Sequence, residues 1–154
     1  MKSDISPSIT RPSNHPIVRT LASFPIACFT CALFTDLAYV QTTRMMWADF
    51  SDWLLAVGMA GGVIAFVAGL VSLFIHRRRE SYRPAWPAVI GSLLVLAVAF
   101  LNNLVHSRDA WTSVMPTGLA LSGATVVLML ATAVLATRVN DRRKLVSSYG
   151  EVRQ

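Results

Sequence analysis

The chain has 154 residues, of which 54% are hydrophobic and 14% are charged, and its mean hydropathy is +0.52. This composition is more apolar than that of ordinary soluble domains, so it argues against a soluble globular fold. The net charge of +6 would suit nucleic acid binding in a soluble protein. Here the basic residues flank apolar stretches, and we expect no nucleic acid partner.

Four apolar stretches account for most of the chain, and none of them contains Lys or Arg. They run over residues 21–40, 53–75, 86–106 and 116–137. A helix of about 20 residues crosses the ~30 Å hydrocarbon core of a bilayer. Because short connections join the stretches, we predict an all-α integral membrane four-helix bundle with up-down-up-down topology.

Basic residues are distributed unevenly around these stretches. All but Arg44 and Arg108 of the 14 Lys and Arg residues lie before the first stretch, between the second and third, or after the fourth. Four crossings place those three regions on one side, so the positive-inside rule predicts that both termini are cytoplasmic. The basic residues expected to attract anionic phospholipid there are Arg77, Arg78, Arg79, Arg83, Arg142, Arg143 and Lys144.

This topology divides the chain into three parts. We predict a flexible cytoplasmic segment over 1–14, a four-helix membrane domain over 15–138 and a basic cytoplasmic tail over 139–154. Ser51 or Asp52 is expected to cap the second helix, and Pro116 is expected to lie in the first turn of the fourth.

Small residues recur along one side of the second stretch: Gly58, Gly61, Gly62, Ala65 and Gly69. Small side chains let helix backbones approach closely in lipid, so this stripe predicts a helix-packing face. The stripe serves packing within one chain or, as the alternative, homodimerisation through the second helix.

Asp36 is the acidic residue that lies well inside an apolar stretch. An aspartate in the bilayer interior is costly and needs polar partners. At 1.5 Å per residue, Asn102, Asn103 and Ser122 lie at a depth similar to that of Asp36. We therefore predict an intramembrane polar cluster of Asp36 with Asn102 or Asn103 and with Ser122. It serves either as hydrogen-bonding glue between helices or as a proton or ligand site.

Cys28 and Cys31 form a CxxC motif on the first helix, a pattern that membrane thiol oxidoreductases also use. Their depth near the middle of the membrane and the lack of a second cysteine pair argue against a redox role. His15 and His76 are the weak candidates for haem binding at the cytoplasmic mouth, without a further evident ligand. We expect no cofactor and no bound metal, and haem is the alternative.

The residues resemble a family of predicted four-span bacterial membrane proteins known as domain of unknown function 2231. The resemblance covers roughly residues 14–140, and the order and spacing of its motifs carry it. These motifs are His15-Pro16, Phe24-Pro25-Ile26-Ala27, Asp36, Gly58 with Gly62, Gly69-Leu70, and the region from Asn102 to Arg108. The resemblance implies a bacterial inner membrane and no established activity.

Taken together, these features favour a multi-pass inner-membrane protein of non-enzymatic, structural character that binds lipid or a partner. Two alternatives stay open. The first is a membrane redox protein that uses the CxxC motif or haem. The second is a small proton-coupled transporter or channel that uses Asp36.

Overall fold

The computed structural model describes the backbone of residues 16–76, 86–108 and 114–151 and the side chains of residues 20–75, 86–108 and 114–139. This part of the chain is all-helical, with helices α1 (Pro16–Thr42), α2 (Met45–His76), α3 (Trp86–His106) and α5 (Leu119–Glu151). A short helical turn, η1 (Val114–Gly118), precedes α5. All four long helices are long and apolar enough to cross a membrane. The predicted all-α membrane bundle is confirmed.

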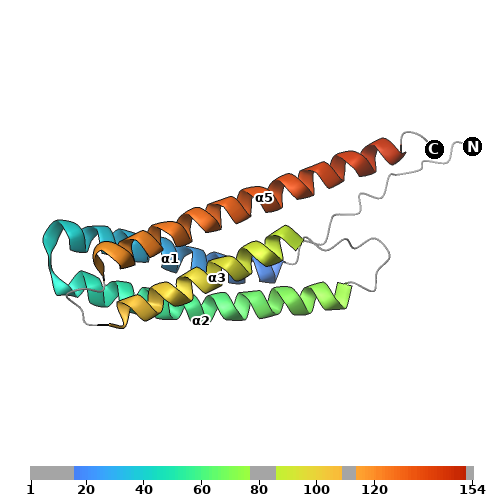
Figure 1. Ribbon diagram of the computed structural model, residues 1–154. Helices are drawn as coiled ribbons and strands as arrows, with labels where there is room; N and C mark the ends of the chain where they lie inside the picture. The colour runs from blue at the N-terminus through green and yellow to red at the C-terminus, as the bar shows by residue number, and fades with distance from the viewer. Residues whose placement is uncertain (1–15, 77–85, 109–113, 152–154) are drawn as a thin grey trace, which may run out of the picture.

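The four helices form a closed ring. Each helix packs on the next along the chain, and α5 closes the ring by packing on α1. Figure 1 shows the long axes running side by side, with α5 diverging from α2 toward the end where α2 finishes and α3 begins. The bundle therefore has a tight end, at the α1–α2 turn, and a splayed end.

The α1–α2 turn is much shorter than the sequence suggested. α1 ends at Thr42 and α2 begins at Met45. Thr43 has a positive φ of 52°, and its N–H donates to the carbonyl of Tyr39 at 2.7 Å. This left-handed residue closes the helix C-terminus. The prediction that Ser51 or Asp52 caps the second helix is wrong, because both lie inside α2, and the polar run before residue 53 is helical.

The start of the last helix also differs from the prediction. Pro116 lies in η1 rather than in the first turn of α5, and Met115 before it is extended (φ −113°, ψ 132°). Proline disfavours helical backbone in the residue that precedes it, which explains the extended Met115. At its other end α5 continues to Glu151, so its backbone is helical through most of residues 139–154.

Many large apolar side chains are exposed, whereas several small or polar ones are buried inside the bundle. Phe34, Trp53 and Val127 are each more than 60% exposed, whereas Ala32, Ala99 and Asp36 are almost wholly buried. In water this arrangement would be unstable, but lipid solvates the large apolar side chains and small residues let the helices approach. The solvent around this bundle is therefore a bilayer.

Candidate functional site

The interior of the tight end holds five buried polar residues from all four helices. They are Asp36 from α1, Ser51 from α2, Asn102 and His106 from α3, and Ser122 from α5, and none is more than 2% exposed. We call this group the Asp36 site. It is the part of the described chain in which polar side chains of every helix converge.

A simple periodicity directs these side chains inward. Buried residues recur on α2 at 51, 55, 58 and 62 and on α3 at 95, 99, 102 and 106. Spacings of three and four residues keep side chains on one face of a helix. Ser51 thus shares a face with the glycine stripe of α2, and His106 shares one with Asn102.

Both carboxylate oxygens of Asp36 accept hydrogen bonds. Oδ1 accepts from the Ser51 hydroxyl at 2.5 Å and lies 3.0 Å from His106 Nε2. Oδ2 accepts from the Ser122 hydroxyl at 2.5 Å. Side chains from three other helices therefore surround the carboxyl group, which offsets the cost of placing an acid inside a membrane.

The hydrogen bonds close into a ring that begins and ends at Asn102. Its amide nitrogen Nδ2 donates to Ser122 Oγ at 2.8 Å, and Ser122 in turn donates to Asp36. On the other side of the carboxyl group, His106 Nδ1 lies 3.1 Å from the backbone carbonyl of Asn102. The ring links α1, α3 and α5, and Ser51 adds α2.

The partners of His106 define where its protons lie. A carbonyl oxygen only accepts, so Nδ1 carries a proton and donates it to Asn102. Nε2 and Asp36 Oδ1 are 3.0 Å apart and need one proton between them, because two unprotonated atoms at that distance repel. Imidazolium with carboxylate, or imidazole with carboxylic acid, both satisfy this geometry. The pair therefore holds one shared proton.

Apolar layers close the Asp36 site along the bundle axis. On the side of the α1–α2 turn, Tyr39, Ala48 and Val114 form a buried cluster, with Met45 and Trp47 packed against it. On the other side lies a second buried cluster of Phe29, Ala32, Leu55, Val95 and Ala99. The polar groups are thus enclosed by apolar side chains in both axial directions.

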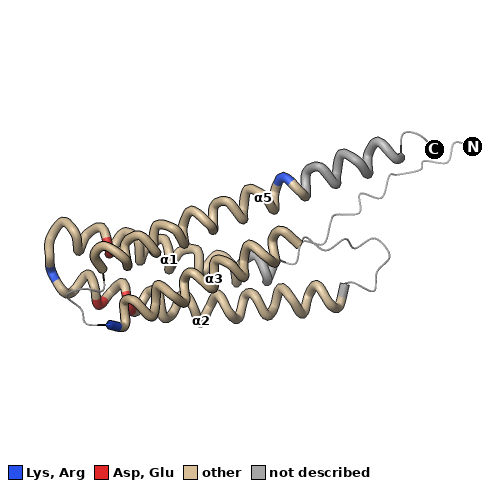
Figure 2. Tube along the Cα trace, in the orientation of Figure 1, with Lys and Arg blue, Asp and Glu red and all other residues tan. Residues whose placement is uncertain are grey.

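One acceptor in the site has no partner. Asn102 Oδ1 is buried and makes no hydrogen bond within the described residues. Asp52, which is half-buried on α2, lies close enough to His106 to interact with it electrostatically. Figure 2 shows that the described acidic residues gather in the half of the bundle that holds this site.

Sequence reasoning identified only part of the site. The structure brings together Asp36, Asn102 and Ser122, whereas Asn103 is partly buried and is not among the hydrogen-bond partners of the carboxyl group, which are Ser51, His106 and Ser122. The predicted cluster did not include His106 or Ser51. His106 carried a usable signal, since it lies four residues after Asn102 on the same helical face. Ser51 was not expected in the cluster because the second helix was predicted to begin after it.

The glycine stripe of α2 divides into contacting and open positions. A Cβ on Gly58 would lie 2.8 Å from the Cβ of Cys28, and one on Gly61 would lie 2.6 Å from the ring of Phe24, both on α1. On Gly62 it would lie 2.8 Å from Leu96 of α3. These three glycines pack within the chain, Ala65 is partly buried, and Gly69 has no atom within 4 Å of an added Cβ.

The remaining candidates are dispersed. Cys28 is buried and Cys31 is exposed, and both are free thiols. Among the described residues, no group of three or more His, Cys, Asp and Glu side chains is arranged to hold a metal ion. Several predicted site residues lie outside the described side chains: His15, His76, Arg77, Arg78, Arg79, Arg83, Arg142, Arg143 and Lys144.

Comparison with known proteins places the whole membrane domain in one family. A family model described as a predicted membrane protein (DUF2231) matches residues 14–147. No curated protein and no solved structure matches the chain. The match extends over all four helices, including every residue of the Asp36 site.

Proposed function

Because the chain belongs to the DUF2231 family of predicted membrane proteins, we propose a function exercised inside a bilayer. The protein is a non-enzymatic structural bundle of the bacterial inner membrane. The Asp36 site fastens its four helices together, and its arginine-rich cytoplasmic side binds anionic phospholipid. Both termini lie on that side.

The observation that carries the structural role is the completeness of the hydrogen bonding around Asp36. Both of its oxygens are engaged by side chains of α2, α3 and α5, and apolar clusters close the site in both axial directions. A pocket for a polar ligand presents convergent polar groups that are free to bind it. The carboxylate oxygens of Asp36 instead bind side chains of the other three helices. Such bonds matter in lipid, where little hydrophobic force holds helices together.

The lipid-binding role rests on the placement of basic residues. The run Arg77, Arg78 and Arg79 directly follows α2 in the sequence, and Arg138 near the end of the α5 span is exposed. Each basic residue near an anionic surface contributes about 1 kcal/mol. These charges favour phosphatidylglycerol or cardiolipin over zwitterionic lipid around the arginine-rich side.

Spin-labelled lipids test this preference in the full-length protein reconstituted into vesicles. We expect the immobilised lipid fraction to be larger for labelled phosphatidylglycerol than for labelled phosphatidylcholine, and the difference to fall with salt. Replacing Arg77, Arg78 and Arg79 by Gln should reduce it, whereas replacing Arg44 and Arg108, at the opposite end, should not. Equal immobilisation of both lipids by the parent protein would refute lipid selectivity.

The shared proton of Asp36 and His106 favours a second candidate, a proton-coupled transporter or channel. An acid inside a membrane commonly marks a proton pathway. The discriminating measurement is proton flux into vesicles containing the protein and a pH-sensitive dye, under an imposed potential. A proton flux that Asp36→Asn abolishes would show that the structural assignment is wrong and would favour the transporter or channel. A structural role gives the same flux for the parent, Asp36→Asn and empty vesicles.

A further inference from the structure

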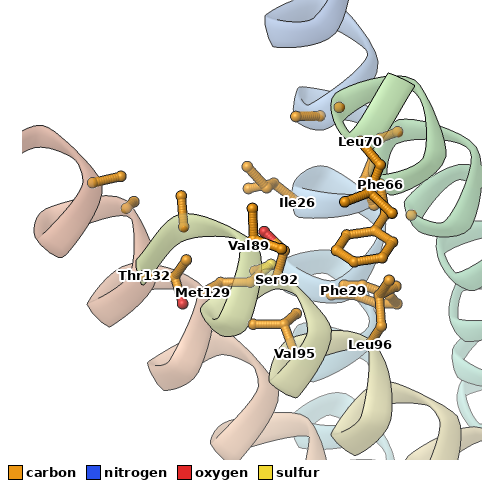
Figure 3. Close-up of a pocket in the computed structure, with 18 of the residues that line it drawn as sticks. Ile26, Phe29, Phe66, Leu70, Val89, Ser92, Val95, Leu96, Met129 and Thr132 are labelled. Atoms are coloured by element: carbon orange, nitrogen blue, oxygen red, sulfur yellow. The ribbon is translucent and has the colours of Figure 1, made fainter. Parts of the chain in front are cut away.

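The splayed end of the bundle contains an apolar cavity of about 410 Å³. All four helices line it, and Figure 3 shows side chains such as Phe66, Val89 and Met129 arranged around the space. Of the lining residues, only Ser92 and Thr132 carry a hydroxyl group, and none is charged. Its volume falls within the range of ordinary small-molecule sites, and its chemistry suits a hydrocarbon.

The cavity is separate from the Asp36 site. Phe29 and Val95 line its inner end and also belong to the buried apolar cluster that closes the Asp36 site. The cavity extends from this layer toward the end of α2 and the start of α3. It therefore occupies the half of the bundle nearest the arginine-rich side.

The length of the cavity matches one leaflet of a bilayer. On α2 the lining residues run from Gly62 to Leu73, which at 1.5 Å per residue is about 16 Å. Half of a ~30 Å hydrocarbon core is ~15 Å. An acyl chain of the leaflet on the arginine-rich side thus has the right length and depth to fill it.

We propose that this cavity holds one acyl chain of an anionic phospholipid drawn from that leaflet. The choice of headgroup rests on the proposed function and on charge complementarity. Arg138 is exposed near the cavity end of α5, on the helix face opposite the lining residues Met129 and Ala136. In the sequence, Arg77 comes four residues after Leu73, the last lining residue of α2. Basic residues that follow the cavity-lining segments of α2 and α5 in the sequence favour a phosphate group with net negative charge at this end of the chain's membrane domain.

Two matched variants of α5 test the proposal. Met129, Thr132, Ala133 and Ala136 line the cavity, whereas Ala131 does not line it and lies on the opposite face of α5. Ala133→Phe places a ring in the cavity, whereas Ala131→Phe places the same ring in the surrounding lipid. Both proteins are expressed at full length in bacterial membranes, extracted in mild detergent and weighed by native mass spectrometry.

We expect the parent and Ala131→Phe to retain one phosphatidylglycerol or cardiolipin per chain, and Ala133→Phe to lose at least nine tenths of it. Equal retention by the two variants, or no adduct on the parent, overturns the proposal. A retained fatty acid, isoprenoid quinone or zwitterionic phospholipid overturns the assigned occupant. If Ala133→Phe elutes as aggregate, the smaller Ala136→Leu takes its place and must lower retention relative to Ala131→Phe.

The outcome is independent of the spin-label experiment. If the spin labels show a headgroup preference but mass spectrometry finds no lipid adduct that Ala133→Phe removes, lipid binds the basic surface. The cavity inference is then wrong. If Ala133→Phe removes a lipid adduct but the spin labels show no headgroup preference, the cavity holds an acyl chain. The proposed selectivity for anionic lipid is then wrong.

Discussion

The two ends of this bundle use the same four helices in opposite ways. At the tight end, buried polar side chains of all four helices meet around Asp36 and bond to one another. At the splayed end, small residues such as Ala65, Gly69 and Ala88 face a cavity. The difference shows what lipid as a solvent permits, because apolar surfaces gain little by meeting each other there, whereas buried polar groups must find partners.

The largest expected effect on stability comes from removing the carboxyl group at the tight end. Asp36→Leu removes the common acceptor and leaves the buried side chains of Ser51, His106 and Ser122 without their partner. We expect the free energy of unfolding, measured by titration with SDS in mixed micelles, to fall by about 3 kcal/mol. Asp49→Leu, at an exposed acid of α2, is the control. A variant as stable as the parent would show that the site does not hold the helices together.

Glycine substitutions on α2 sharpen the contrast between the two ends. Gly58→Ala places a Cβ 2.8 Å from that of Cys28, and α1 must move to accept it. This overpacking should cost about 2 kcal/mol of unfolding free energy in the same titration. Gly69→Ala meets open space and removes a flexible residue from a helix, so stability should stay equal or rise by up to ~1 kcal/mol. Equal losses at both positions would contradict the assignment.

A double-mutant cycle measures how strongly the shared proton couples α1 to α3. Asp36→Asn and His106→Gln each alter one side of the 3.0 Å contact. The two changes in unfolding free energy should deviate from additivity by about 1 kcal/mol. The pair Asp49→Asn with His106→Gln serves as the reference. Additive behaviour for Asp36 and His106 would mean that the serines alone hold the carboxyl group.

The smallest expected effect lies at the splayed end. Ala133→Phe adds a ring to existing space, so its unfolding free energy should differ from that of Ala131→Phe by no more than about 1 kcal/mol. Ala99→Phe, at a residue that is 1% exposed beside the Asp36 site, should by comparison cost about 3 kcal/mol. If Ala133→Phe were as damaging as Ala99→Phe, the cavity would be closed in the membrane.

Sequence reasoning predicted the depth of the polar residues in the membrane, but it did not identify every residue of the cluster. Counting along each stretch put Asp36, Asn102 and Ser122 at similar heights, because depth follows from the helical rise alone. It did not separate Asn102 from Asn103, whose side chains leave the helix on different faces. Ser51 was assigned to a cap because its neighbours are polar, although they lie on a helix that starts at Met45.

The sequence by itself determined the solvent, the number of helices and the presence of an acid that needs partners. Hydropathy and length decide these properties one segment at a time. Only the tertiary structure decided that His106 and Ser51 are among those partners, that Gly58 is closely packed while Gly69 is open, and that a cavity remains between the helices. The reason is that helices apolar on every side carry no polar face to report their rotation, so the orientation of each side chain emerges only when all four helices pack together.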